Sequence, residues 1–128
     1  MNKVNKERLH TSFPKLFQSP INIECRDGWF DLIYQLCVDI TKECEQLGLV
    51  DDDWPCAVQV KEKFGCLRFY TSNSTDQIDE LKHIAMNDSM TICEVCGATG
   101  RHYKEDCYRT LCDSCEVEHE RELKERWS

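Results

Sequence analysis

Near the middle of the chain lies Ala57-Val58-Gln59-Val60-Lys61-Glu62-Lys63-Phe64-Gly65-Cys66-Leu67-Arg68-Phe69-Tyr70-Thr71. Apolar and polar residues alternate in both halves of this stretch, which is the period of a half-buried β-strand. Phe64-Gly65 lies between the halves, and Gly65 supplies the positive φ that a tight turn requires. Residues 57–71 are therefore predicted to form a β-hairpin.

The alternation assigns a set of side chains to each face of the hairpin. The apolar face, which is expected to pack on a helix, consists of Val58, Val60, Leu67 and Phe69. The polar face consists of Gln59, Lys61, Lys63, Arg68 and Tyr70. Four of these form a candidate site for an anionic partner: Lys61, Lys63, Arg68 and Tyr70. The alternative is that they are ordinary solvated strand residues.

A long amphipathic helix is predicted before the hairpin, over residues 27–48. Its apolar residues recur every three or four positions: Trp29, Phe30, Ile33, Leu36, Cys37, Ile40, Cys44 and Leu47. Asp27 suits the N-cap, and Gly48 suits the position that ends a helix. Cys37 and Cys44 lie on the apolar stripe, so they are expected to be buried thiols.

A second helix is predicted after the hairpin, over residues 76–90. Ser74-Thr75-Asp76-Gln77 has the form of a capping box, and Ile78, Leu81 and Ala85 are expected to face inward. Residues 1–26 show no sustained period. We expect only a short turn there, capped by Ser12, with nearby aromatic residues docked on the core.

The C-terminal third contains two C-x-x-C pairs, Cys93/Cys96 and Cys112/Cys115, separated by 15 residues. Each pair places two sulfurs on one side of a tight turn, and two such turns complete the tetrahedral shell of Zn²⁺. The sequence therefore predicts one structural zinc ion. Dithiol redox chemistry is the alternative use of a C-x-x-C pair.

The residues between and after the two pairs predict the rest of a zinc finger. Residues 101–104 and 107–111 are expected to pair as a short hairpin, and residues 116–127 are expected to form a helix. A knuckle, a hairpin and a C-x-x-C pair at a helix start resemble a treble-clef zinc finger. Cys107 and His102 lie between the pairs and are expected to be hairpin residues rather than ligands.

The sequence thus predicts an α+β fold: helix, β-hairpin, helix, then a small four-cysteine zinc finger of treble-clef type. It divides into a basic N-terminal segment (residues 1–26), a helix/β-hairpin/helix core (27–90) and the zinc finger with its C-terminal helix (91–128). Four protein ligands close the metal shell, so the ion is expected to be noncatalytic.

The composition limits the cellular compartment and the classes of partner that we expect. No stretch of the 128 residues approaches the roughly 18 apolar residues that a spanning helix needs, and no export signal is recognised, so we expect a cytoplasmic protein. Disulfides are then not expected.

The net charge is −8, yet residues 1–26 carry five basic and two acidic side chains. An acidic chain is not expected to coat DNA nonspecifically, although a local basic face can still contact nucleic acid. Six cysteines remain without a motif: Cys25, Cys37, Cys44, Cys56, Cys66 and Cys107.

Three blocks of sequence resemble a family of small bacteriophage and prophage proteins. They are Asp27-Gly28-Trp29-Phe30-Asp31-Leu32-Ile33, the stretch from Gln59 to Tyr70, and Cys93-Glu94-x-Cys96-Gly97. The resemblance extends from about Phe13 to Cys115. It implies a phage context, with the host cytoplasm as the location, and it implies no activity.

Three functions compete at this stage. The first is a noncatalytic binding protein that acts on a host protein or a nucleic acid. The second is the capture of a small anionic ligand, such as a nucleotide, to counter host defence. The third is a treble-clef nuclease, which needs a histidine base on the hairpin and further metal ligands on the helix. Only His102 and His119 are near those places, and no Asp-His pair occurs, so no catalytic residue is assigned.

Overall fold

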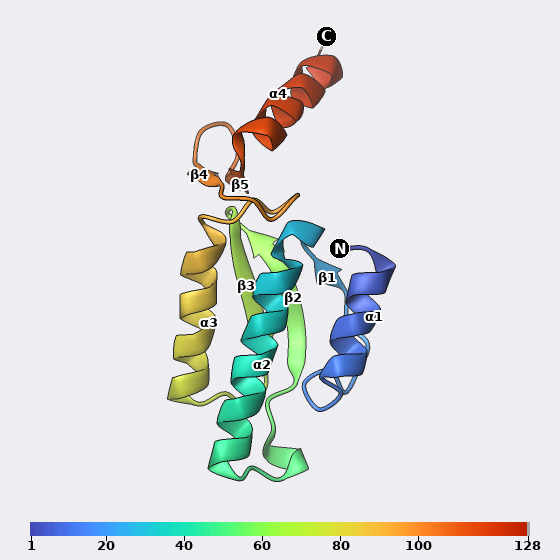
Figure 1. The fold of residues 1–128 in the computed structure, drawn as a ribbon, viewed down its shortest axis with the longest axis vertical. Coiled ribbons are helices and arrows are strands. Elements are labelled where there is room, and N and C mark those ends of the chain that lie inside the picture. Colours follow the sequence, from blue (N-terminus) through green and yellow to red (C-terminus); the bar gives the residue numbers. More distant parts are fainter. Residues whose placement is uncertain (128) are drawn as a thin grey trace.

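The computed structural model describes residues 1–127, and Figure 1 shows its course. Its elements, in chain order, are α1 (Lys3–Ser12), β1 (Ile23–Glu24), the 3-10 turn η1 (Asp27–Trp29), α2 (Phe30–Leu47), the 3-10 turn η2 (Asp51–Asp53), β2 (Ala57–Lys63), β3 (Cys66–Thr71), α3 (Asp76–Ser89), β4 (Arg101–Tyr103), β5 (Arg109–Leu111) and α4 (Asp113–Trp127). The predicted α+β class and the order helix, hairpin, helix are confirmed.

Strands β1, β2 and β3 form a mixed sheet in that order. The predicted hairpin is confirmed, with β2 antiparallel to β3 and Lys61 opposite Arg68. The sequence does not predict strand β1, which runs parallel to β2 and places Ile23 beside Val60. Two residues are too few to show a period, so this strand is specified by its partner rather than by its own sequence.

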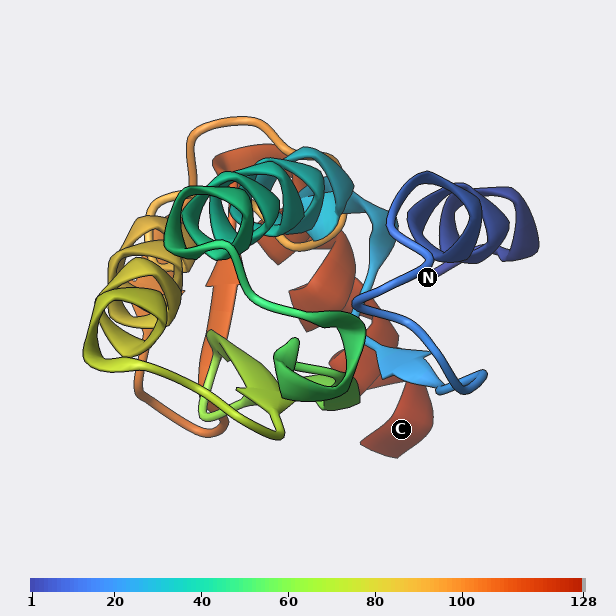
Figure 2. The same ribbon diagram turned by 90° about the horizontal axis from the view of Figure 1, so that it is seen from below.

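The three helices α1, α2 and α3 lie on one side of the sheet (Figure 2). The core fills the space between these two layers. Its fully buried side chains include Leu9, Leu16, Ile23, Trp29, Ile33, Ile40, Val60 and Ile78. The opposite face of the sheet carries the polar side chains of the hairpin, and we call it the outer face.

Helix α2 is close to its prediction, with corrections at both ends. Gly48 ends the helix at φ 63° as expected. Asp27, however, is not its N-cap, because the 3-10 turn precedes the helix and puts Trp29 in that position. Asp27 instead accepts hydrogen bonds from Asn2 N and Asn5 Nδ2. Leu47, which the stripe predicts to be buried, is 50% exposed, since residues 45–47 of the last turn are all exposed.

Two further expectations at the hairpin and helix α3 are wrong. Strict alternation assigns Val58 to the apolar face, but a register irregularity between Ala57 and Gln59 turns it outward, and it is exposed. Helix α3 is capped by Thr75 rather than by Ser74, and the Thr75 side chain accepts a hydrogen bond from Ile78 N. The cap therefore lies one residue later than the capping box suggests.

The N-terminal segment holds a helix that its sequence does not predict. Helix α1 is capped by the Asn2 side chain, which accepts from Asn5 N at 2.8 Å. Only one of its residues, Leu9, is buried, which explains why no apolar period is visible. The expected docking of nearby aromatics is confirmed, because Phe13 and Phe17 are buried in the core.

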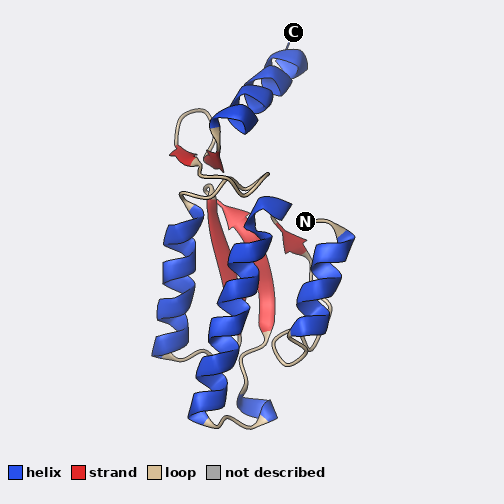
Figure 3. Cartoon of the chain, in the orientation of Figure 1, coloured by secondary structure: helices blue, strands red, loops and turns tan. Residues whose placement is uncertain are grey.

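Helix α3 lies along the free edge of β3. Ser89 is fully buried there, and its Oγ accepts a hydrogen bond from Leu67 N at 2.9 Å. The C-terminal segment, residues 91–127, sits at the end of the sheet where the hairpin turns, and α4 projects away from the body (Figure 1). Apart from α4 and two short strands, this segment is loop (Figure 3).

Candidate functional site

The two C-x-x-C pairs meet in the C-terminal segment. The ligand atoms of Cys93, Cys96, Cys112 and Cys115 all lie within 4.8 Å of one another. The sulfurs of Cys96 and Cys112 are 3.6 Å apart. Four sulfurs around one ion with bonds of about 2.3 Å lie about 3.8 Å from each other. All four are free thiols rather than disulfides, so this cluster can hold a metal ion.

Local backbone geometry presents these sulfurs. Gly97 has φ 82°, and its N–H donates to the carbonyl of Cys93 at 2.9 Å, which closes the first turn. The second pair opens helix α4, where Cys115 N donates to Cys112 Sγ at 3.5 Å. A helix start directs N–H groups toward negative charge and so stabilises thiolates. Helix α4 begins three residues earlier than predicted, which brings the second cysteine pair to that start.

The electrostatics of the cluster favour a bound cation. Burial raises the pKa of Cys93, but backbone hydrogen bonds from Cys112 and Cys96 outweigh burial and lower it to about 7. Burial, followed by hydrogen bonds with the other three thiols, raises the pKa of Cys115. Four thiols packed this closely cannot all ionise in the absence of a cation, because the thiolates would repel one another. A divalent ion offsets that repulsion and displaces the protons. With all four sulfurs bound, a tetrahedral ion has no open position for a substrate.

The first cysteine turn docks on the start of α2. Gly28 N donates to the carbonyl of Glu94 at 2.7 Å, and Trp29 Nε1 donates to the carbonyl of Ile92 at 2.8 Å. Arg26 N donates to the Glu94 carboxylate at 3.1 Å. That carboxyl has a pKa raised mainly by burial. These contacts cross the boundary at residue 90 that the sequence suggests.

The short hairpin of the C-terminal segment docks on the tip of the β2–β3 hairpin. Thr110 is fully buried, and its Oγ1 donates to the carbonyl of Gly65 at 2.7 Å. His102 Nδ1 lies 3.0 Å from the same Thr110 hydroxyl. The predicted pairing of this hairpin is confirmed, with His102 opposite Thr110. Burial, and then the charge of Lys104, lower the pKa of His102.

An internal ion pair ties β5 to helix α4. Arg109 donates to both carboxylate oxygens of Glu116, through Nε at 2.8 Å and through Nη2, and both side chains are nearly buried. The hydrogen bond from Arg109 lowers the pKa of the Glu116 carboxyl. The Arg109 guanidinium also lies 4.7 Å from the ring centre of Tyr103. Arg109 therefore has a structural role.

The remaining cysteines divide by burial. Cys37 and Cys44 are buried as predicted, and Cys25 and Cys66 are buried as well. Burial raises the pKa of Cys25 to about 12, and it raises the pKa of the other three too. These four thiols are unreactive parts of the fold. Cys56 is half-buried, whereas Cys107 is exposed and lies outside the metal cluster.

The candidate partner-binding residues share the outer face, as the alternation predicts. Lys61 and Arg68 are register partners, and Lys61 Nζ lies 5.9 Å from the ring centre of Tyr70. Lys63 lies at the hairpin tip, with Nζ 5.6 Å from the Phe64 ring. Arg68 turns toward helix α3 instead, where its Nη1 contacts Met86 Sδ. The structure thus separates Arg68 from the two lysines at the side-chain level.

Arg68 faces a cavity of about 400 Å³ between β3 and α3. Its polar lining consists of Arg68, Tyr70, Thr71, Ser74, Asp79, Lys82 and His83. The Asp79 carboxylate is paired with Lys82, with Oδ1 3.7 Å from Nζ. The Nε atom of Arg68 is buried and has no hydrogen-bond partner, and within residues 1–127 the guanidinium contacts no carboxylate. Lys82 Nζ donates to the hydroxyls of Thr71 and Ser74, and burial lowers its pKa although Asp79 opposes that shift.

Lys82 and His83 are not among the predicted site residues. The sequence contains one clue at Lys82, which lies four residues after Ile78 and three before Ala85 and so places a cation on the inward stripe of helix 76–90. Comparison of the chain with protein families, curated proteins and solved structures finds no match. The described helices include none long and apolar enough to cross a membrane.

Proposed function

We propose that this protein is a noncatalytic binding protein that recognises an anionic group on a host protein or a nucleic acid. The anion would bind in the cavity between β3 and α3, which Arg68 and Tyr70 line, next to Lys61 on the outer face. One structural zinc ion, held by a treble-clef finger, would stabilise the end of that sheet. The resemblance to phage proteins supports the host cytoplasm as the location of this activity.

The zinc assignment rests on the donor set. Four thiolates in two C-x-x-C turns suit Zn²⁺ better than hard cations, which take oxygen ligands. The treble-clef assignment rests on the order of elements, with a cysteine turn, the β4–β5 hairpin and a second cysteine pair at the start of α4. Their contacts with Gly28 and Gly65 explain how an ion there supports the hairpin.

The observation that carries the binding proposal is the state of Arg68. A guanidinium N–H that is removed from water without a hydrogen-bond partner costs free energy. The Arg68 Nε atom is in that situation, and the side chain borders a cavity that also contains the Lys82 ammonium. An anion in the cavity would remove this cost and would be held by Arg68 and by Lys82, where it would compete with the Asp79 carboxylate.

A small anionic ligand such as a nucleotide is the second candidate. The volume of the cavity, about 400 Å³, falls in the range of small-molecule sites. Tyr70 is 40% exposed at the rim and offers a face on which a base can stack. Capture of such a ligand in the host would counter a defence that signals through nucleotides.

The test is a pull-down from bacterial lysate with the parent, Arg68→Gln and Lys42→Gln. Lys42 is an exposed cation on α2, so it controls for net charge. Loss of a charge-assisted contact of about 1.5–3 kcal/mol should reduce recovery of the partner by about tenfold or more for Arg68→Gln only. Nuclease treatment separates a nucleic-acid partner from a protein partner. Mass analysis of the eluate detects a bound nucleotide. Equal recovery by all three proteins contradicts the proposal.

A further inference from the structure

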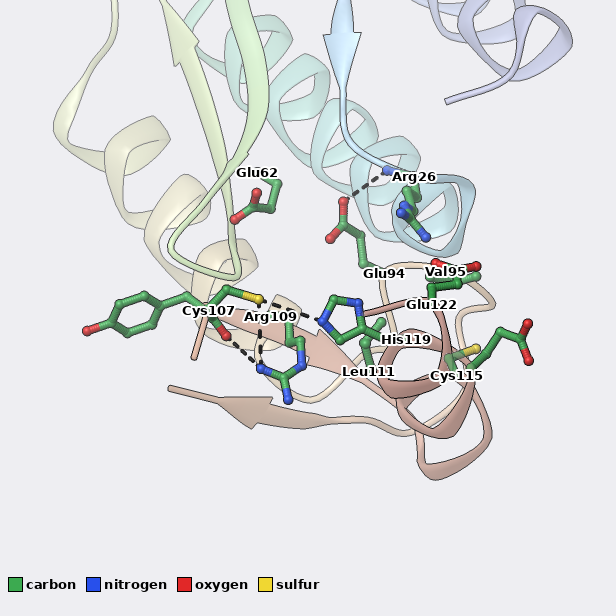
Figure 4. Close-up of a pocket in the computed structure, with 12 residues that line it drawn as sticks. Arg26, Glu62, Glu94, Val95, Cys107, Arg109, Leu111, Cys115, His119 and Glu122 are labelled. Carbon is green, nitrogen blue, oxygen red and sulfur yellow. Dashed lines mark hydrogen bonds between the residues drawn. The ribbon is translucent and has the colours of Figure 1, made fainter. Parts of the chain in front are cut away.

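A second cavity, of about 340 Å³, lies where the C-terminal segment meets the core (Figure 4). Four elements or turns contribute potential metal ligands to it. The donors are Glu62 near the end of β2, Glu94 in the first cysteine turn, Cys107 in the loop between β4 and β5, and His119 on α4. None of these four belongs to the four-cysteine cluster, although Cys115 of that cluster lines the same cavity.

Cys107 and His119 already have the spacing of two ligands on one ion. The distance between Cys107 Sγ and His119 Nε2 is 3.7 Å. On a tetrahedral zinc ion, a sulfur bonded at about 2.3 Å and a nitrogen at about 2.0–2.1 Å lie about 3.6 Å apart. The Cys107 thiol is exposed and the His119 ring is half-buried, so both are accessible to an ion from solvent.

The surrounding contacts hold this pair in place. Arg109 Nη1 donates to the carbonyl of Cys107 at 2.7 Å and lies 3.9 Å from its Sγ, so it fixes both the loop and the thiol. The same Arg109 binds Glu116, one turn before His119 on α4. One guanidinium thus positions both the loop and the helix. A preformed ligand pair lowers the ordering cost of binding.

Glu62 and Glu94 also line the cavity, and the Glu94 carboxylate is turned toward Arg26 rather than toward the Cys107–His119 pair (Figure 4). Each is oriented by one backbone hydrogen bond, from Gly65 N to Glu62 Oε2 at 2.7 Å and from Arg26 N to Glu94 Oε2 at 3.1 Å. The second oxygen of each carboxylate accepts no hydrogen bond from the residues the structure describes, so it is available to an ion.

The charges around the cavity favour a cation. Glu118 and Glu122 of α4 add two carboxylates to the lining, whereas the cations there are Arg26 and Arg109. Arg109 is already paired with Glu116, and Glu118 is paired with Arg121, which leaves Arg26 against the three carboxylates of Glu62, Glu94 and Glu122. A thiol, an imidazole and carboxylates together suit a borderline ion such as Zn²⁺ or Co²⁺ rather than Mg²⁺.

We propose that Cys107 and His119 bind a second divalent transition-metal ion in this cavity, with Glu94 or Glu62 moving inward to supply an oxygen ligand. Binding displaces the thiol proton of Cys107 to solvent and leaves His119 neutral. Water completes the shell. Unlike the four-cysteine cluster, this site keeps an exchangeable position. It is independent of the anion-binding proposal, because the two cavities share no lining residue.

The test is a Co²⁺ titration of the full chain after its four-cysteine cluster has been loaded with Zn²⁺. The parent should bind one additional equivalent, with the strong visible absorption of tetrahedral Co²⁺ and a thiolate charge-transfer band. Cys107→Ser and His119→Gln should each lose that equivalent. Cys56→Ser, another thiol outside the cluster, should keep it.

Any Co²⁺ that exchanges into the four-cysteine cluster absorbs equally in every variant and cancels in the difference spectrum. Melting temperatures show whether each variant is folded. If Cys107→Ser is unfolded, His119→Gln alone decides the result. No additional equivalent in the parent, or an equal additional signal in His119→Gln, overturns the proposal.

Discussion

Gly28 carries no side chain at the place where the first cysteine turn meets helix α2. A Cβ at this position would lie 2.2 Å from the Cys93 carbonyl oxygen and 2.5 Å from the Glu94 carbonyl carbon. Both neighbours are backbone atoms of the first cysteine turn, so neither can rotate away. Gly65 is in a similar position at the hairpin tip, where an added Cβ would lie 2.8 Å from Arg109 N. Two glycines thus permit the docking of the C-terminal segment.

Gly28→Ala is expected to destabilise the fold by about 3 kcal/mol, because the turn must move away from α2. Urea unfolding measures the loss, and limited proteolysis should show residues 91–127 cleaved first. Gly48→Ala is the control. Gly48 has φ 63°, and a methyl group at this position would meet no atom within 4 Å, so only its backbone conformation is strained, at about 1–2 kcal/mol. Equal protection of residues 91–127 in Gly28→Ala and the parent contradicts this prediction.

At the scale of elements, α2 is the central packing unit of the helical layer. Its buried side chains are Phe30, Ile33, Leu36, Cys37, Ile40 and Cys44. This stripe is visible in the sequence because it repeats over 18 residues. The period alone therefore locates the helix and its buried face.

Ile40→Asp is expected to prevent soluble folding. The position is fully buried, and an unpaired carboxylate there costs several kcal/mol, which is comparable to the whole stability of a small domain. Gln35→Ala, on the exposed side of α2, should change the free energy of unfolding by at most about 0.5 kcal/mol. Soluble expression and thermal melting provide the measurement. An Ile40→Asp protein that melts like the parent would show that the stripe is misplaced.

Other elements could not be predicted, for physical reasons. Helix α1 buries only Leu9, so its cap at Asn2 is the sole local indication. Strand β1 depends on the pairing of Ile23 with Val60, which lies 37 residues further along the chain. The exposure of Val58 follows from a bulge that strict alternation does not encode. In each case a tertiary contact determines the local structure.

At the scale of the whole molecule, the four cysteines were predictable because each pair is local and their spacing is characteristic of a metal site. The two cavities were not. One combines Arg68 with Lys82, which meet only because α3 lies along the edge of β3. The other joins Cys107 to His119 only because Arg109 holds the loop against α4. Sites made by packing between elements leave no pattern along the sequence.

Removal of the metal is expected to affect more than the C-terminal segment. Structural zinc contributes about 10–16 kcal/mol of apparent binding free energy in isolated fingers, so a strong chelator should unfold residues 91–127. The core then loses its contacts at Gly28 and Gly65, and its melting temperature should fall as well. Circular dichroism and metal analysis measure both effects.

Substitution of one cysteine of the cluster tests the same prediction without a chelator. Cys112→Ser should lose the ion of the four-cysteine cluster and show the lowered melting temperature without chelator. Cys56→Ser should retain the ion and melt like the parent. Full metal content at the cluster in Cys112→Ser is the result that contradicts the assignment.

The hydrogen bond from Trp29 to Ile92 gives the protein an optical reporter of its own. The Trp29 indole is fully buried where α2 meets the first cysteine turn. When the turn opens, water reaches the ring and its fluorescence should shift to longer wavelength. Trp54 donates to the Leu49 carbonyl instead, so its emission is not expected to respond to the cysteine turn. Replacing Trp54 and Trp127 by Phe would leave Trp29 as the sole indole. The emission wavelength of the protein would then follow the occupancy of the four-cysteine cluster in real time.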